Sequence, residues 1–445
     1  MSLSSGDARA PRPNILVITL DDVGVDKIGI YGAPAGSPPT PTLDALARRG
    51  VLFENAYTNP VCSPTRVAML TGRYAWRTGA GAVVGAPGSG PGDFLPSADE
   101  VTLPELLAPA GYRNWAVGKW HMANATWPGG RNNHPVQWGG FDLHAGTIAN
   151  VSSAAFSDSD WFDWPKNVAD ENGFQVVPTR AYATSETVDD ALALINTPSE
   201  QPFFMWLAFN APHKPFHAPP SELHTQGPLC EGACGAVDKY AAALQALDTE
   251  LGRLFASMRP TVAKRTTVIV LGDNGTPPEA VNQAGLSQKS KGSVFQGGIR
   301  VPMIVWGSAV ANGGRVHTGM VDAVDVFSTV LHIARLRVPN DGVARDSQSI
   351  YPAIANLPTS DRAWSYAERF EPNGFDAPKT LHRRAAQNSA GWKLHHYPRV
   401  GPPAKLQLYY LPDDPHETNN RYPPSTPAEE AAAAELLAVL ELNGS

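Results

Sequence analysis

The clearest pattern along the chain is a series of short apolar runs that end in polar residues. The first run, "NILVITL" at 14–20, is rich in β-branched residues and stops at Asp21 and Asp22. Comparable runs are "PFFMWLAF" at 202–209, "TTVIVLG" at 266–272 and "VPMIVWG" at 301–307. Continuous apolar runs of this length are typical of strands buried on both faces of a parallel sheet.

Helical patterns alternate with these predicted strands. "TPTLDALARRG" at 40–50 has Thr40 or Thr42 near its start and Gly50 beyond its end, as expected of a helix with its terminal signals. Helix-type spacing also covers 184–196 and 237–258, and "VTLPELLAPAG" predicts a helix before the strand "YRNWAVG". Strands that alternate with helices favour an α/β/α sandwich around a large, mostly parallel mixed sheet.

The composition changes past about residue 340, where the chain becomes polar and rich in turns. Short strands are predicted at 362–369, 380–388, 391–397 and 405–411, and the Ala/Leu/Glu stretch 427–442 predicts a helix. We therefore expect a main domain over 14–340 and a small C-terminal subdomain over 341–445, with antiparallel strands and one covering helix. Residues 1–13 are expected to be a disordered segment or a remnant of expression engineering that replaced a natural leader.

Composition and charge narrow the function. The chain has 35 Lys and Arg against 42 Asp and Glu, for a net charge of −7, and its basic residues are scattered. This balance disfavours a nucleic-acid partner. Because no run of about 18 apolar residues occurs, we expect no membrane span and a soluble protein. The compartment is undetermined, with the periplasm or secretion expected if a leader was removed.

Polar residues follow the predicted strands, and ligands gather at the carboxyl ends of strands in such sheets. The residues that could share one cleft are Asp21, Asp22, Lys119, His121, Asn210, His213, Asp273 and Asn274. Adjacent carboxylates repel each other unless a cation or protons offset their charge. Oxygen donors without a Cys/His cluster favour Ca²⁺, with Mg²⁺ as the alternative. The competing interpretation is that either acidic pair simply caps the segment after it.

Cys62 stands out in "NPVCSPTRVAMLTGR" at 59–73. Pro64 indicates that a helix begins beside the cysteine, so an anion there would meet free N–H groups and the positive end of the helix dipole. Arg66 lies one turn along the same face and adds a cation. The alternative is a buried structural cysteine. Cys230 and Cys234 are close enough in sequence for a local bridge, although two free thiols are an equal possibility.

"CSPTR" followed by "TGR" resembles the C-x-P-x-R signature of the sulfatase family, in which the cysteine is oxidised to formylglycine. In family order, "ITLDDVG", "YRNWAVGKWHMA", "LGDNG" and "KGSVFQGGIRVPMIVW" resemble further family segments, over residues 14–307. Ala123 stands where the family usually has Gly. The resemblance implies an arylsulfatase-like sulfuric ester hydrolase of the alkaline phosphatase superfamily, with 14–340 as its catalytic domain. It also implies that a formylglycine-generating enzyme meets the chain during maturation.

The resemblance also implies roles for individual residues. The metal ligands would be Asp21, Asp22, Asp273 and Asn274, together with the residue formed from Cys62. Arg66 and Lys119 would hold formylglycine and offset the sulfate charge, and His121 would be its base. His213 and Lys291 would bind the sulfate and assist the departing alcohol. His217, Lys214 and Lys289 are nearby competitors for these last two roles, and Thr147 is a weak candidate for a further polar position.

The predicted chemistry has a physical basis. A thiol is a poor ligand for a hard cation, whereas a hydrated aldehyde offers a metal-bound gem-diol, with one hydroxyl to attack sulfur and the other to drive release. The resemblance implies that the substrate is a small-molecule or saccharide sulfate ester. Aromatic residues between 115 and 164 either stack on the leaving group or simply pack the loops: Trp115, Trp120, Trp127, Phe141, Trp138, Phe156, Trp161, Phe162 and Trp164.

Two other functions compete. One is hydrolysis of phosphonate or phosphate esters on the same scaffold, because a similar tetrahedral anion fits a cationic site. The other is a noncatalytic binder of sulfated glycans, and the presence of Lys119, His121, His213 and Lys291 counts against it. A cysteine-nucleophile phosphatase is disfavoured, because its loop needs five residues between Cys and Arg whereas Cys62 and Arg66 have three between them.

Overall fold

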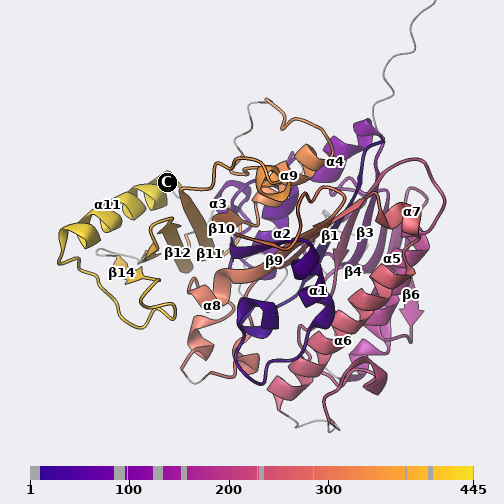
Figure 1. Cartoon of the computed structure of the whole chain (residues 1–445), viewed down its shortest axis with the longest axis horizontal. Helices are drawn as coiled ribbons and strands as arrows, with labels where there is room; N and C mark the ends of the chain where they lie inside the picture. Colours follow the sequence, from indigo (N-terminus) through magenta and orange to yellow (C-terminus); the bar gives the residue numbers. More distant parts are fainter. Residues whose placement is uncertain are drawn as a thin grey trace, which may run out of the picture.

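The computed structural model describes most of the chain (Figure 1). The described residues are 11–84, 96–97, 99–123, 134–151, 158–227, 229, 235–283, 285–341, 343, 345–375, 378–398 and 404–443.

A ten-stranded sheet forms the middle of the described main domain, in the order β10-β2-β9-β8-β1-β7-β3-β4-β5-β6. Its strands are β1 (Asn14–Leu20), β2 (Val51–Tyr57), β3 (Arg113–Lys119), β4 (Leu143–Thr147), β5 (Trp164–Asp170), β6 (Gly173–Thr179), β7 (Phe203–Ala208), β8 (Thr266–Gly272), β9 (Arg300–Gly307) and β10 (Arg315–Asp322). The central strands β8, β1, β7, β3 and β4 run parallel to one another. β9 is antiparallel to both β2 and β8, and β5 and β6 form an antiparallel edge. The predicted mostly parallel mixed sheet is confirmed.

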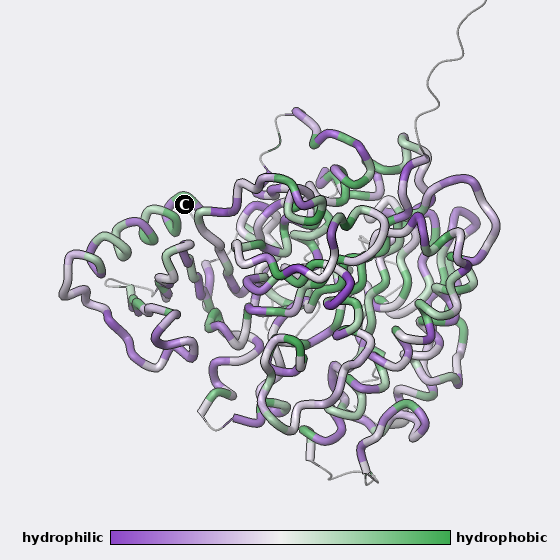
Figure 2. The backbone as a smooth tube through the Cα atoms, in the orientation of Figure 1, coloured by the Kyte–Doolittle hydropathy of each residue, from purple (hydrophilic) through white to green (hydrophobic). Residues whose placement is uncertain are grey.

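Helices cover both faces of this sheet (Figure 1). One face packs against α1 (Pro41–Arg49), α5 (Ala183–Ile195) and α6 (Ala236–Ser257), and the other against α2 (Cys62–Thr71), α4 (Leu103–Leu107) and α9 (Asp325–Ile333). β1 shows why, because Ile15 and Val17 belong to one apolar cluster whereas Leu16 and Ile18 belong to the other. Figure 2 shows hydrophobic residues concentrated along these central strands. The predicted α/β/α layers are therefore confirmed.

Four further α-helices are short: α3 (Ala75–Thr78), α7 (Pro260–Ala263), α8 (Gln296–Ile299) and α10 (Tyr351–Ile354). None of the described helices combines the length and the apolar character needed to cross a membrane.

A second, four-stranded antiparallel sheet lies beside the main domain. It consists of β11 (Trp364–Glu371), β12 (Leu381–Asn388), β13 (Trp392–Tyr397) and β14 (Lys405–Tyr410), in that order. Helix α11 (Pro427–Leu442) packs on one face, where Leu394, Leu408 and Leu436 share an apolar cluster (Figure 1). The strands and the helix agree with the sequence prediction, whereas the boundary near residue 340 stays a prediction.

The sheet order places the carboxyl ends of β8, β1, β7 and β3 next to one another. A glycine allows the close approach of β3 to β7. Gly118 has φ +88°, and a Cβ on it would lie 2.0 Å from the carbonyl oxygen of Ala208. A side chain at this position would therefore be excluded both by backbone conformation and by contact. Lys119, the next residue, is delivered to the same edge as the residues that follow β1 and β8.

Candidate active site

The polar residues that follow the central strands meet in one buried cluster. Asp21 and Asp22 follow β1, and His213 lies beyond β7. Each of these residues and Cys62 offers a ligand atom, and the four atoms lie within 4.8 Å of one another. All four side chains are buried. The shared strand edge thus brings together residues that are up to 192 positions apart in the sequence, from Asp21 to His213.

Helix α2 places Cys62, its first residue, at the cluster. The hydroxyl oxygen of Thr65 accepts a hydrogen bond from the backbone N–H of Asn59 at 3.1 Å, which anchors the segment before the helix. Sγ of Cys62 lies 3.5 Å from Oδ1 of Asp21 and 3.9 Å from Nζ of Lys119. Burial raises the pKa of the Cys62 thiol, and the nearby carboxylate of Asp273 adds to the rise. The thiol is therefore neutral and a weak nucleophile.

Arg66 forms a buried clamp between two of the strands. Its Nε and Nη2 donate to Oδ2 of Asp273 at 2.9 and 2.8 Å, and its Nη1 donates to the carbonyl oxygen of Lys119 at 2.8 Å. Oδ1 of Asp273 accepts from the backbone N–H of Asp22 at 3.1 Å. Both oxygens of Asp273 are thus engaged within the chain, and the guanidinium is fully buried behind the cluster.

Two lysines approach the carboxylates that follow β1. Lys119 pairs with Asp21, and Nζ of Lys291 lies 2.5 Å from Oδ1 of Asp22. Burial favours a higher pKa for Asp22, but Lys291, His213 and Lys119 outweigh it and hold the pKa of Asp22 well below its usual range. Burial lowers the pKa of His213 to about 3, although its Nε2 lies 3.7 Å from Oδ2 of Asp22. Asp22 is therefore ionised and His213 is neutral at pH 7.

His121 has a strained backbone and an unused ring nitrogen. Its φ is +60°, in the left-handed region, and its carbonyl oxygen accepts a hydrogen bond from the Ser63 hydroxyl at 2.7 Å. Nδ1 of His121 is buried and has no hydrogen-bond partner among the described residues. Burial, together with Lys119 and Arg66, holds the pKa of His121 well below its usual range. The ring is therefore neutral at pH 7, with Nδ1 unengaged by the described residues.

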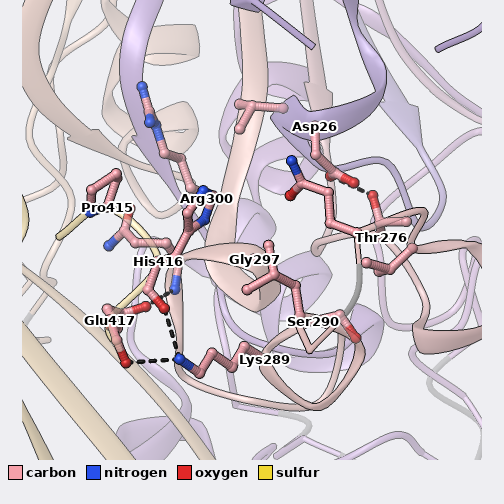
Figure 3. Close-up of a pocket in the computed structure, with 14 residues that line it drawn as sticks. Asp26, Thr276, Lys289, Ser290, Gly297, Arg300, Pro415, His416 and Glu417 are labelled. Atoms are coloured by element: carbon pink, nitrogen blue, oxygen red, sulfur yellow. Dashed lines mark hydrogen bonds between the residues drawn. The ribbon is translucent and has the colours of Figure 1, made fainter. Parts of the chain in front are cut away.

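The neighbouring competitors lie elsewhere. Lys214 has a half-exposed side chain beside Glu279, and His217 stacks on Trp161 with ring centroids 3.9 Å apart. Lys289 donates to the carbonyl oxygens of His416 and Glu417, both at 2.8 Å (Figure 3). His213 and Lys291 are therefore the members of these pairs that reach the cluster.

Two residues of this region were weakly indicated, or not indicated at all, by the sequence. Thr147 ends β4 and donates to Oδ1 of Asn210 at 3.1 Å, next to the cluster residues. Tyr240, in the middle of α6, donates its hydroxyl to the carbonyl oxygen of Asp22 at 2.7 Å. A tyrosine on the buried face of a helix looks like any other core residue, so the sequence carried no signal for it.

The described aromatic residues pack in the interior. Trp115, Trp120, Trp138, Phe141, Trp161 and Trp164 are buried, and Phe162 packs against the same core. These residues therefore pack the loops and the core, which is one of the two interpretations of the aromatic segment; the other was stacking on the leaving group. Trp127, Phe156, Cys230 and Cys234 lie outside the described residues.

The donors at this edge fit a hard divalent cation. Oδ1 of Asn274 is buried without a hydrogen-bond partner in the described part of the chain, while its Nδ2 donates to Oδ1 of Asp22 at 2.8 Å. Such an orphaned oxygen beside carboxylates is what a cation would satisfy. Three carboxylates, Asp21, Asp22 and Asp273, face three cations, Arg66, Lys119 and Lys291. A divalent ion would therefore make the cluster net positive and attractive to an anion.

A buried cluster that fits a metal ion, beside a cationic clamp at the carboxyl edge of an α/β/α sheet, is suited to binding an anionic ester. Known proteins agree. The family model described as "Sulfatase" matches residues 13–336, and the model "N-sulphoglucosamine sulphohydrolase, C-terminal" matches residues 289–441. N-acetylgalactosamine-6-sulfatase of Canis lupus familiaris is 32% identical over 390 residues, covering 81% of this chain and 70% of that protein. Arylsulfatase A of Bos taurus is 30% identical over 387 residues, covering 81% and 71%.

Solved structures extend the likeness to nearly the whole chain. Ps i-CgsB in complex with k-i-k-neocarrahexaose has a TM-score of 0.76 at 25% identity, covering 97% of this chain and 92% of that one. A structure bound to its substrate D-glucosamine-2-N,6-O-disulfate has a TM-score of 0.72 at 20% identity, covering 97% of both chains. The chain belongs to the sulfatase family, has its alkaline phosphatase-like fold and hydrolyses sulfate esters.

Proposed function

We propose that this enzyme removes sulfate from a saccharide, with formylglycine formed from Cys62 as the nucleophile and Ca²⁺ as the metal. The observation that carries the proposal is the position of Cys62. Its Sγ lies at the first residue of α2, 3.5 Å from a carboxylate oxygen of Asp21 and 3.9 Å from the ammonium of Lys119. An oxygen nucleophile at this point would lie beside both metal ligands and positive charge.

Four residues from two neighbouring strands would hold the ion: Asp21, Asp22, Asp273 and Asn274. Carboxylate and amide oxygens without sulfur suit Ca²⁺, and Mg²⁺ is the alternative. When bound, the cation lowers the pKa of a coordinated hydroxyl and polarises the sulfate oxygens. Asp273 keeps its contact to Arg66, so the ion site and the clamp share one carboxylate.

Arg66 and Lys119 would hold negative charge at position 62. The bond from Arg66 to the carbonyl oxygen of Lys119 fixes the end of β3, and thereby the starting point of the Lys119 side chain. Hydrated formylglycine supplies two hydroxyl groups at this position, one for attack on sulfur and one for the later release of sulfate. Both cations are fully buried, so solvent weakens their field little.

His121, His213 and Lys291 would handle protons and charge on the substrate. The free Nδ1 of His121 suits it to accept the proton of the second hydroxyl, which releases sulfate. His213 and Lys291 both lie beside Asp22 and would bind the sulfate group. When the S–O bond to the alcohol breaks, the alcohol oxygen takes its proton from one of these two residues.

A saccharide substrate is supported by the relatives. The mammalian relatives include N-acetylgalactosamine-6-sulfatases, one similar structure was solved with k-i-k-neocarrahexaose, and another was solved with D-glucosamine-2-N,6-O-disulfate. Aryl sulfates would serve as artificial substrates, because the proposed chemistry needs only the sulfate and a leaving oxygen.

The test combines mass and turnover. The enzyme is produced with a formylglycine-generating enzyme, and the mass of the proteolytic peptide that contains Cys62 is measured alongside turnover of sulfated saccharides, 4-nitrophenyl sulfate and an aryl phosphonate ester. We expect the aldehyde mass, preferred turnover of sulfates and loss of turnover in Cys62→Ala. A thiol that persists at position 62 in active enzyme would overturn the nucleophile, and faster turnover of the phosphonate would overturn the preference for sulfate.

A further inference from the structure

The face of the small sheet that is turned away from α11 carries a row of cations. Arg369 of β11 lies directly opposite Arg383 of β12, and Tyr397 of β13 lies directly opposite Lys405 of β14. The pairing of Arg384 with His396 continues the register, so that Arg383 and Tyr397 stand side by side. These four residues, three cations and Tyr397, therefore form a row that crosses all four strands. Like charges on directly opposite residues destabilise a sheet, so this arrangement calls for a compensating anion.

Described carboxylates compensate only one end of the row. Arg369 pairs with Glu371 at 2.6 Å. Arg383 forms one hydrogen bond within the described part of the chain, from Nη1 to the carbonyl oxygen of Gly292 at 3.2 Å. No described carboxylate lies within ion-pair distance of Arg383 or of Lys405, whose side chain is exposed.

A cavity of about 290 Å³ lies over this uncompensated end. One wall is the segment 288–295, which contributes Gln288, Ser293, Val294 and Phe295, and the other contains Arg383, Tyr397, Lys405 and Gln407. The lining thus combines two cations, two aromatic rings and two amides, which suits an anionic sugar. The hydroxyl of Tyr397 is engaged with Nδ1 of His395 at 3.1 Å, so Tyr397 offers the cavity its ring.

The cavity adjoins the active site through the segment 288–295. Lys291, which contacts Asp22, immediately precedes Gly292, whose carbonyl oxygen receives bonds from both Arg369 and Arg383 at 3.2 Å. In the same segment, Lys289 donates hydrogen bonds to the backbone carbonyl oxygens of His416 and Glu417 (Figure 3). The segment 288–295 therefore both forms one wall of the cavity and carries Lys291.

We propose that the cavity between segment 288–295 and the row of Arg383, Tyr397 and Lys405 binds a second anionic group of the substrate, carried on a sugar near the cleaved ester. The inference rests on the proposed saccharide substrate. It makes the small sheet a specificity element that prefers polyanionic saccharides to esters with a single charge. Arg383 and Lys405 supply the charge, and the ring of Tyr397 packs against the sugar.

Steady-state kinetics at two ionic strengths test this subsite. The substrates are 4-nitrophenyl sulfate, with one anionic group, and two sulfated disaccharides, of which one carries a second sulfate and the other a uronate carboxylate. The variants are Lys405→Gln and Arg383→Gln, with Arg48→Gln as the control, because Arg48 is an exposed cation on α1. Lys405→Gln tests the cavity without disturbing the segment 288–295, because, among the described residues, Lys405 makes no hydrogen bond to that segment, whereas Arg383 donates to Gly292.

We expect Lys405→Gln to raise KM for at least one disaccharide about threefold to fivefold at low salt, and Arg383→Gln to raise it about tenfold. Added salt should shrink both differences. Kinetics on 4-nitrophenyl sulfate should not change in Lys405→Gln, and Arg48→Gln should match the wild type throughout. The disaccharide that shows the effect identifies the anion as sulfate or carboxylate.

Two failures are distinguishable. If the wild type cleaves the disaccharides and both variants keep its KM on each of them, the subsite is wrong and the proposed function stands. If the wild type cleaves 4-nitrophenyl sulfate but neither disaccharide, the saccharide proposal fails together with the subsite that rests on it. An equal loss on all three substrates in Lys405→Gln would assign Lys405 to structure and would also overturn the subsite.

Discussion

Replacing Glu417 by Gln should loosen the contact between the small sheet and the main domain. Glu417 is buried, and its Oε1 lies 2.9 Å from Nζ of Lys393 and 2.8 Å from Nε2 of His395. Its Oε2 accepts a hydrogen bond from the backbone N–H of Gln296, at the start of α8, at 2.5 Å. One carboxylate therefore links β13 to the segment that follows Lys291. Gln has the same shape but leaves the buried ammonium of Lys393 without an opposing charge.

The size of the effect follows from the pKa of Glu417. Burial alone would raise it, but Lys393 and His395 outweigh burial and lower the pKa of Glu417 from 4.5 to about 2. This difference corresponds to about 3 kcal/mol of stability. Because the folded-state pKa is the lower one, the contribution is complete above about pH 4.5 and is lost as the pH falls toward 2. Breaking a buried pair by removing one partner costs a comparable 3 to 5 kcal/mol, roughly.

Calorimetry at pH 7 measures the loss. For unfolding of the whole 445-residue chain, about 3 kcal/mol lowers Tm by about 3 °C. Hydrogen exchange of the β13 amides gives a local measure, and these amides should exchange faster in Glu417→Gln. The double variant Glu417→Gln with Lys393→Met should recover part of the stability, because it removes the orphaned charge. A single variant within about 0.5 kcal/mol of the wild type, or additive losses in the double variant, would refute the reasoning.

Three further predictions concern the active site. Gly118→Ala should abolish most sulfate turnover and lower Tm. The control Gly111→Ala, with a similar φ of +85° but open space around it, should cost only about 1 kcal/mol of stability, measured from Tm. Equal effects of the two changes would exclude the contact with Ala208 as the cause. Dialysis against EGTA should remove activity and lower Tm, and Ca²⁺ should restore both better than Mg²⁺; unchanged Tm and turnover after verified metal removal would contradict a resident ion. His213→Gln should reduce kcat on 4-nitrophenyl sulfate at nearly constant Tm, whereas His217→Gln should reduce Tm at nearly constant kcat, because His217 stacks on Trp161; the reverse pattern would exchange their roles.

The sequence could predict the central strands and the residues that follow them, because both depend on local pattern. A parallel strand buried on both faces is an unbroken apolar run, and β1, β7 and β8 have no exposed position. Asp21, Asp22, Asp273 and Asn274 then share an edge because their strands are parallel neighbours. The strands that the sequence did not predict have mixed patterns. β5, "WPKNVAD", contains Pro and Lys, and β6 is largely exposed, so tertiary pairing decides their conformation.

Pairings within the site were beyond local reasoning. Lys289 and Lys291 are two residues apart and chemically identical. The family resemblance favoured Lys291, but the partner of each lysine is visible only in the folded chain, where Lys289 reaches the backbone of Glu417 and Lys291 reaches Asp22. The bond from Arg66 to Asp273 likewise joins residues 207 positions apart. A motif can indicate that both residues belong to a site, but the partner of each charge depends on sheet order and register.

The small sheet and the catalytic cluster act as one unit, although the composition changes between them. Two backbone hydrogen bonds join the main domain to the segment around Lys291. Lys291 N–H donates to the carbonyl oxygen of Thr276 at 2.9 Å, and Gly292 N–H donates to that of Pro60 at 2.8 Å. The small sheet contacts the same segment through Arg369 and Arg383, which donate to the carbonyl oxygen of Gly292. Because Lys291 is held by residues on both sides of the predicted boundary near residue 340, we expect its charge to stay in place as the ester bond breaks, which is the condition for electrostatic stabilisation of a transition state. The predicted boundary would therefore divide the architecture but not the proposed site.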